Sequence, residues 1–465
     1  MERILFLALG ALLSWSLTAQ TTFEKVFPTY VTSSSESRGT VIVQTPDQGY
    51  AVIVQENDGT IRKLLVRFSA TGGLVNVDDY LSSISDLKIA ADGRLVFAGQ
   101  KDNSMLVMKT TSDGFPLWIT TGGEGYAPSA TSVCMTADGS ICAAGTADNP
   151  IYSDSRIVAL KTTSDGTILW SRIFGTAGKR YSGNSVLGSP DGGFMVLGTV
   201  KTGMTGPEDI FMLKLSATGD SMWTKIYNRS QYDIGRFILS AETSGFLAVG
   251  HSWIPDGNNR FFLVRTDLQG DTLWTREFGL LSPGDILGAT AVADGGYLLA
   301  GVNAKDSLDE SKIILYRIDD QGALLWSKTV GSYQSEYVFS VTGTTDHGFA
   351  LSGSIWDNNT QTMKLYLLKT DSLGNYVPSA QPEMTLDDAV QVFPNPATDA
   401  VRVLLPENAL RAELVSLQGE CMAVAEPADP AGRTVIFRIS DLASGVYLIR
   451  ITTATSVVSR KIVKL

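Results

Sequence analysis

The sequence is poor in the residues that build cross-links and metal sites. Its 465 residues include three cysteines and two histidines. Three cysteines are too few for a disulfide framework, and His251 and His347 lack the spacing of metal ligands. We therefore interpret both histidines as structural and expect no metal and no cofactor. Cys134 and Cys142 flank one predicted turn, where the spacing is compatible with either a disulfide or two buried thiols.

Charged residues are also scarce, and their signs are unbalanced. They make up 18% of the chain, with 37 Lys and Arg against 48 Asp and Glu, so the formal net charge is −11. Nucleic acids and anionic membrane surfaces attract clustered Lys and Arg, so this balance argues against both as the main partner. Beyond the first 20 residues no apolar run approaches the length of a membrane span, which predicts a mature chain without one.

The first 19 residues have the pattern of a secretory signal peptide. Arg3 supplies the positive start, residues 4–13 form an apolar stretch, and Ala19 is the small residue at its end. We expect cleavage between Ala19 and Gln20, with export through the Sec pathway to the periplasm.

The most informative pattern is a repeat of about 50 residues. Five tryptophans are separated by 52, 53, 51 and 52 residues, and a glycine stands four residues before each of them: Trp118, Trp170, Trp223, Trp274 and Trp326. A second phrase, a glycine-containing turn that leads into apolar residues, occurs seven times and is typical of hairpins. Each unit therefore predicts four strands, which in the clearest copy lie near 185–189, 194–200, 210–216 and 221–227.

These units predict the fold class. No segment after the signal shows sustained helical periodicity, so the class is all-β, and seven units of four strands predict a seven-bladed β-propeller over residues 20–380. TTFEKVF near the N-terminus matches TLWTREF of a repeat and places Phe23 in the tryptophan position, whereas Pro378 occupies it in the last unit. Proline cannot donate a ladder hydrogen bond, so we expect residues 22–27 to supply the outermost strand of the last blade.

The tryptophans are expected to pack between neighbouring blades rather than to bind sugars. Phrases such as KTTSDGTILW resemble the tryptophan-docking repeats of the quinoprotein family. Members of that family have eight blades, a pair of adjacent cysteines and a calcium site at the cofactor. This chain has seven units and no adjacent cysteines, so the resemblance implies the propeller scaffold alone.

A different pattern follows a polar linker at 381–388. Strands are expected near 400–405, 412–416, 434–439, 446–452 and 457–463, which predicts a small C-terminal β-sandwich at 389–465. Four blocks in this region resemble the C-terminal sorting domain of type IX secretion cargo from the Bacteroidetes: Pro394-Asn395-Pro396, LVSLQG, DLASGVYLIRI with Gly445 and Tyr447, and the basic end RKIVKL with Lys461. The resemblance implies the type IX secretion machinery as partner and a secreted or outer cell-surface location.

Propeller geometry also predicts where a ligand would bind. Loops from the outer strand of one blade to the inner strand of the next converge on one face, around the central channel. Tyrosines, carboxylates and cations recur there, and this mixture suits sugars or peptides, although the tyrosines could equally cap the blade ends. The candidates are Arg38, Asp86, Tyr181, Tyr232, Asp233, Arg236, Asp285, Tyr333 and Glu336.

The sequence favours a binding function. It contains no phosphate loop, nucleophile elbow or zinc-protease motif, and we assign no catalytic residue. We expect a secreted or cell-surface protein that recognises an extracellular glycan or protein. The alternative is a secreted polysaccharide hydrolase or lyase at the mouth of the channel, with Asp86, Asp233, Asp285 and Glu336 as its acids and bases. A purely structural surface component is a third interpretation.

Overall fold

The computed structural model describes most of the chain beyond residue 19. The described residues are 20–27, 36–57, 61–80, 83–149, 154–203, 205–241, 245–253, 259–281, 286–303, 311–333, 335–358, 360–378, 390–393, 395–405, 409–416, 419–425, 434–453 and 457–465. The expected signal peptide with Ala19, the linker at 381–388, Asp285 and Pro394 lie outside them.

The described part of residues 20–378 forms β-strands that pair in groups of four. The first group is β2 (Glu36–Gln44), β3 (Tyr50–Asn57), β4 (Ile61–Phe68) and β5 (Leu74–Tyr80). The second is β6 (Ser83–Ile89), β7 (Leu95–Lys101), β8 (Ser104–Thr110) and β9 (Pro116–Gly122). The third is β10 (Ser129–Met135), β11 (Ile141–Asn149), β12 (Asp154–Thr162) and β13 (Ile168–Phe174). The fourth is β14 (Lys179–Gly188), β15 (Phe194–Thr202), β16 (Glu208–Leu215) and β17 (Ser221–Tyr227).

The remaining groups have the same order. The fifth is β18 (Asp233–Ser240), β19 (Phe246–Trp253), β20 (Asn259–Thr266) and β21 (Thr272–Leu281). The sixth is β22 (Ile286–Ala291), β23 (Tyr297–Asn303), β24 (Lys312–Ile318) and β25 (Leu324–Val330). The last is β26 (Glu336–Gly343), β27 (Phe349–Asp357), β28 (Thr362–Thr370) and β1 (Phe23–Phe27). A parallel bridge between Ser155 and Arg180 joins the third group to the fourth.

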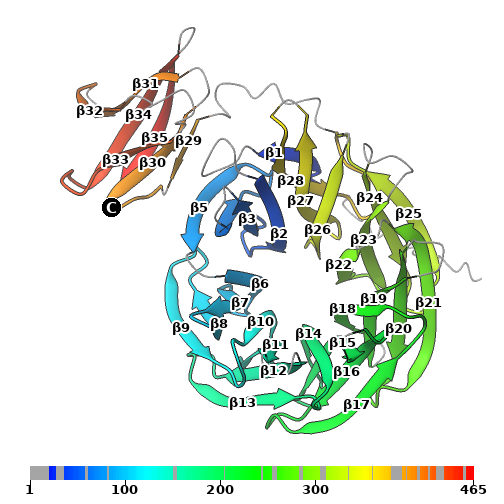
Figure 1. Cartoon of the computed structure of the whole chain (residues 1–465). Helices are drawn as coiled ribbons and strands as arrows, with labels where there is room; N and C mark the ends of the chain where they lie inside the picture. Colours follow the sequence, from blue (N-terminus) through cyan, green and yellow to red (C-terminus); the bar gives the residue numbers. More distant parts are fainter. Residues whose placement is uncertain are drawn as a thin grey trace, which may run out of the picture.

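The groups form a ring, with the first strand of each nearest the axis (Figure 1). First strands contact one another in the circular order β2, β6, β10, β14, β18, β22, β26 and back to β2. The segment β1 lies antiparallel to β28, in register from Phe23 opposite Lys369 to Phe27 opposite Leu365. The N-terminal segment therefore pairs with the last strand of the last group, as its sequence predicts, and the ring of antiparallel sheets is a β-propeller.

Each first strand contains a β-bulge, which the sequence did not reveal. In the clearest copy the bulge at Asn184 breaks the alternation of side chains along the strand. The strand was expected to begin at residue 185, directly after this break, whereas β14 begins six residues earlier, at Lys179. A side chain directly after the bulge can bind the next sheet. Ser132 Oγ accepts a hydrogen bond from Val186 N at 3.2 Å, and Ser340 Oγ accepts one from Ile42 N at 3.2 Å. These bonds connect neighbouring sheets beside the axis.

The tryptophans pack between neighbouring sheets, as expected. Trp170 on β13 is buried, and its ring lies against Gly219 of the next group, where a Cβ atom would come within 2.7 Å of Trp170 Cδ2. Trp118 and Gly166 make the same contact. The glycine four residues before one tryptophan is thus the packing partner of the preceding tryptophan. The other tryptophans of the repeat are half-buried, namely Trp118, Trp223, Trp274 and Trp326.

A second repeated contact joins strands of the same sheet. A buried cation at the end of the third strand pairs with the aspartate of the turn between the first and second strands. Lys214 Nζ lies 2.7 Å from Asp191 Oδ1, and Lys369 Nζ lies 3.0 Å from Asp346 Oδ2. These pairs explain why an aspartate recurs in the turns, which the sequence alone indicated only as turn chemistry.

The C-terminal region lies beside the ring, where β29 contacts β5 (Figure 1). One sheet is formed by β29 (Gln391–Phe393), β30 (Ala400–Leu404) and β33 (Thr434–Arg438). The other is formed by β32 (Cys421–Ala425), β31 (Ala409–Ser416), β34 (Gly445–Thr453) and β35 (Val457–Lys464). Both sheets contribute to one apolar cluster, which includes Val401, Leu414, Phe437 and Ile449.

The structure decides between the two alternatives for the pair of neighbouring cysteines. Cys134 and Cys142 lie opposite each other in β10 and β11, and both are buried free thiols rather than a disulfide. Burial raises the pKa of the Cys142 thiol well above its ordinary value.

Among the described residues, the structure contains no helix that is long and apolar enough to cross a membrane.

Candidate functional site

The described candidate residues lie near the beginnings of the first strands, at one face of the ring. Asp86 is 7% exposed and connects two sheets. Its Oδ2 atom accepts hydrogen bonds from Val133 N at 2.9 Å and Ser132 Oγ at 3.1 Å, and its Oδ1 atom accepts one from Leu87 N at 2.8 Å. This carboxylate therefore replaces the serine that makes the intersheet bond elsewhere.

Two other predicted carboxylates hold the loops before their strands. Asp233 is fully buried and accepts hydrogen bonds from Ser230 N at 2.7 Å and Ser230 Oγ at 2.9 Å. Glu336 is also fully buried, with Lys312 Nζ at 3.1 Å. Burial raises the pKa of Glu336 to about 7 and nearby Glu24 adds to this shift, although Lys312 opposes it.

The three predicted tyrosines differ in exposure. Tyr181 is buried, with its ring edge-on to Phe211 at 5.1 Å between centroids. Tyr333 is half-buried. Tyr232 is 39% exposed, and its ring lies 5.9 Å from that of Trp253. Tyr232 is thus the most accessible of the three.

The two predicted arginines lie on different sheets. Arg38 forms an ion pair with Glu36 at 2.9 Å. Arg236 occupies the bulge of β18 near buried His251. Burial and the positive charge of Arg236 together lower the pKa of His251 to about 4, although the charges of Asp233 and Glu208 oppose this shift. His251 is consequently a neutral, structural side chain.

These positions bear on the enzymatic alternative. A glycoside hydrolase needs two carboxyl groups that face one cavity. Asp86, Asp233 and Glu336 lie on three different sheets, and each binds its own loop or a neighbouring sheet. Among the described residues, no three His, Cys, Asp or Glu side chains come close enough together to hold a metal ion.

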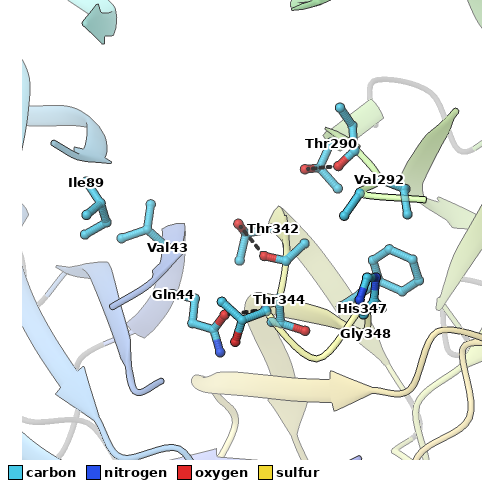
Figure 2. Close-up of a pocket in the computed structure, with 14 residues that line it drawn as sticks. Val43, Gln44, Ile89, Thr290, Val292, Thr342, Thr344, His347 and Gly348 are labelled. Atoms are coloured by element: carbon cyan, nitrogen blue, oxygen red, sulfur yellow. Dashed lines mark hydrogen bonds between the residues drawn. The ribbon is translucent and has the colours of Figure 1, made fainter. Parts of the chain in front are cut away.

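A cavity of about 570 Å³ lies at the opposite ends of the first strands (Figure 2). Its walls are the last residues of β2, β6, β22 and β26 and the turns that follow β22 and β26. The lining residues are Val43, Gln44, Ile89, Thr290, Ala291, Val292, Ala293, Thr342, Gly343, Thr344, Thr345, His347, Gly348 and Phe349. None of the described candidates predicted from the sequence lies in this lining.

The polar groups of this pocket are held in place by hydrogen bonds to the backbone. Thr290 Oγ1 donates to Ala291 O at 3.2 Å, and Thr342 Oγ1 donates to Gly343 O at 3.3 Å. Gln44 Oε1 accepts a hydrogen bond from Thr345 N at 2.7 Å. The threonine protons are therefore engaged within the protein, while lone pairs of their oxygens remain available to a ligand.

An ion pair between buried Lys369 and half-buried Asp346 supports the turn that carries His347. Burial alone would raise the pKa of Asp346, but the Thr344 hydroxyl and the Lys369 ammonium outweigh it and lower this pKa. Lys369 is 1% exposed and lies 3.0 Å from Asp346. The charge of Asp346 next to the pocket is thus compensated by Lys369 of β28.

His347 itself is an exposed member of the pocket lining, although its sequence context suggested a structural residue. Four strands far apart in the sequence form this pocket, so no local motif could indicate it. One signal was available: the second repeated phrase has His347 at a position where four copies have glycine.

In the C-terminal region the structure brings two of the sorting blocks together. Asn395 Nδ2 donates to Lys461 O at 2.7 Å, and Asn395 Oδ1 accepts from Val463 N at 2.7 Å. Gly445 begins β34, and Tyr447 is buried with its hydroxyl donating to Ala443 O at 2.8 Å. The Asn-Pro turn is therefore attached to the last strand.

The C-terminal region also matches a known family. Residues 391–465 match the model of the secretion system C-terminal sorting domain. This domain implies recognition by the type IX secretion machinery and export to the cell surface or the medium. No curated protein matches the chain.

Solved structures resemble the chain more distantly. A puromycin hydrolase is 15% identical with a TM-score of 0.46 over 79% of this chain, which spans 58% of that protein. A glucose dehydrogenase is 13% identical with a TM-score of 0.37, over 63% of this chain and 98% of its own. The β-propeller domain of the Trilobed protease from Pyrococcus furiosus is 8% identical with a TM-score of 0.43, over 77% and 99%. At these values none of the three supports an inference about activity.

Proposed function

We propose that this chain, a β-propeller that carries a secretion system C-terminal sorting domain, is an exported binding protein for an extracellular glycan. In this proposal residues 20–380 are a seven-bladed propeller closed by β1, 381–388 are a linker, and 389–465 are a small β-sandwich read by the secretion machinery. The grouping of the strands and the pairing of β1 with β28 support these limits.

The proposal includes the route of export. Residues 1–19 direct the chain through the Sec pathway to the periplasm and are removed between Ala19 and Gln20. The sorting domain then directs the propeller across the outer membrane. The binding function rests on the propeller alone, because the sorting domain specifies a destination and no ligand.

The observation that carries the binding function is the pocket at the ends of the first strands. It lies on a rigid ring, it is lined mainly by neutral side chains, and its hydroxyl and amide groups are fixed by the bonds of Thr290, Thr342 and Gln44. Sugars bind through several oriented hydrogen bonds, and preorganised partners reduce the entropy that binding must overcome.

The test is a binding assay with the purified full chain on an array of extracellular glycans. Thr342→Trp places a large ring in the pocket, so binding is expected to be lost. Ser240→Trp adds the same ring to the last residue of β18, which does not line the pocket, so binding is expected to persist. Absence of glycan binding by the wild-type chain, or equal binding by both variants, would contradict the proposal, and protein ligands would then be sought by pull-down.

A further inference from the structure

His347 occupies a backbone conformation that equivalent turns give to glycine. In six of the described turns between first and second strands, the residue after the aspartate has a positive φ. It is glycine in four of them, with φ between 76° and 100°: Gly93, Gly139, Gly192 and Gly295. In the other two it is Gln48, with φ 65°, and His347, with φ 64°.

These turns are equivalent in their hydrogen bonds as well. Gln48 N donates to Thr45 O, and His347 N donates to Thr344 O, both at 2.9 Å. The corresponding bond from Gly139 N to Thr136 O is also 2.9 Å. A residue with a Cβ atom is disfavoured in this region, even though histidine tolerates it better than most residues do. The turn therefore does not require a histidine, and glycine would satisfy the backbone better.

The position of the side chain suggests why a histidine is present. His347 is exposed and lines the pocket beside Thr344, while Thr342 and Gln44 line it from β26 and β2 (Figure 2). Gln48, by contrast, is exposed but does not line the pocket. An unfavourable backbone conformation at the edge of a cavity is an observation from which a functional role can be argued.

The chemistry of the lining indicates the class of ligand. None of the lining residues is Lys, Arg, Asp or Glu, and the nearby charges of Asp346 and Lys369 pair with each other. The hydroxyl groups of Thr290 and Thr342 donate within the protein, so they offer acceptor lone pairs to a ligand. An uncharged, hydroxyl-rich ligand can donate to these oxygens, whereas an anionic ligand would lose hydration without gaining a cation.

We propose that His347 contacts the ligand and that the pocket selects uncharged, hydroxyl-rich saccharides over anionic polysaccharides. An imidazole ring can donate a hydrogen bond to a sugar hydroxyl, and in its neutral form it can also accept one. This inference rests on the proposed function and deepens it by assigning a residue and a ligand class.

The experiment compares His347→Gly with Gln48→Gly in the full chain. Both changes restore the residue that four equivalent turns contain, so both variants are expected to fold and to melt at or slightly above the wild-type temperature. The probes are xylohexaose, mannohexaose and laminarihexaose as neutral saccharides, with oligogalacturonate and chondroitin sulfate as anionic ones. Binding is measured by calorimetry, and His347→Asn, which tolerates the same backbone conformation, serves as a second variant.

The expected result is that at least one neutral probe binds the wild-type chain and that the anionic probes bind much more weakly. His347→Gly should weaken binding of that probe by about tenfold, the effect of losing one or two hydrogen bonds, and His347→Asn by less. Gln48→Gly should bind as the wild type does. A loss of affinity without a loss of thermal stability separates ligand contact from a structural role.

Two results would overturn the inference while leaving the proposed function in place. One is binding of a neutral probe that His347→Gly does not weaken, and the other is stronger binding of the anionic probes than of the neutral ones. If no saccharide binds the wild-type chain, the proposed function is wrong and the inference falls with it. Whether any saccharide binds the wild-type chain therefore distinguishes failure of the proposed function from failure of this inference.

Discussion

Gly72 of the first sheet lies directly against the ring of Phe23 from the N-terminal strand. A Cβ atom on Gly72 would come within 2.8 Å of Phe23 Cε2, much as one on Gly219 would come within 2.7 Å of Trp170 Cδ2. Phe23 thus occupies the tryptophan position at the junction where the last sheet meets the first. The junction between the last sheet and the first therefore repeats the contact that joins sheets elsewhere, with a smaller aromatic ring.

The first prediction tests this contact at Gly219. Gly219→Ala combines an unfavourable positive φ of 85° with a clash against Trp170, so we expect a loss of about 2–4 kcal/mol of unfolding free energy. Gly178 has a φ of 79°, but a methyl group added there would meet no atom within 4 Å, and Gly178→Ala should lose only about 1–2 kcal/mol. Urea denaturation measures both, and equal losses would show that the contact with Trp170 has no energetic weight.

The second prediction concerns the tryptophans themselves. Trp170 is 8% exposed, and Trp170→Ala should destabilise the propeller by about 3–5 kcal/mol because it removes a buried ring and leaves a cavity. Trp223 is half-buried, so Trp223→Ala should have a smaller effect, because less apolar surface returns to water. Thermal and urea denaturation of the two variants measure which of them loses more stability. The reverse order would contradict the packing described for the two rings.

The third prediction concerns the bond between Asp86 and the neighbouring sheet. Asp86→Val leaves Val133 N without its acceptor at 2.9 Å, and a buried unsatisfied donor should reduce stability by about 1–3 kcal/mol. Asp86→Ser installs the side chain that Ser132 and Ser340 use for the equivalent bond, and it should retain more stability than the valine variant. Denaturation midpoints measure the difference. Were valine tolerated as well as serine, the intersheet bond would be irrelevant to stability.

Sequence patterns were sufficient to predict the propeller because the residues that determine its packing and turns repeat along the chain. The tryptophan, the glycine four residues before it and the turn phrase recur at one period, and even Phe23 could be placed by the same comparison. In the C-terminal region five strands were predicted near their observed positions, whereas β29 and β32 were missed. β29 is three residues long, and β32 has an exposed sequence without clear alternation.

The candidate site was harder to predict for physical reasons. Asp86, Asp233 and Glu336 have the residue types of a binding site, but their sequence does not show that buried backbone groups are their partners. The pocket depends on β2, β6, β22 and β26 meeting at one end of the ring, and this proximity has no local signature. One signal that could have pointed to that end is His347, which stands in a repeat position where four copies have glycine.

The last prediction uses the buried carboxyl group of Glu336. Its pKa is raised from 4.5 to about 7, so the folded protein binds this proton more tightly than the unfolded chain does. The protonated Glu336 side chain therefore makes its full contribution to the free energy of unfolding below about pH 4.5. This contribution declines as the pH rises to about 7 and does not change beyond that. Glu336→Gln remains uncharged throughout, and its melting temperature relative to wild type should rise between these two pH values.

Asp346 provides the control of opposite sign. Its pKa is lowered from 3.8, so the wild-type aspartate stabilises the fold at neutral pH, and this advantage is lost as the pH falls through the folded pKa. Asp346→Asn should therefore be less stable than wild type at pH 7 and approach it in acid. Scanning calorimetry from acid solution up to about pH 9 measures both differences. A constant difference for Glu336→Gln between pH 4.5 and about pH 7 would mean that Lys312, 3.1 Å away, keeps Glu336 ionised despite its burial.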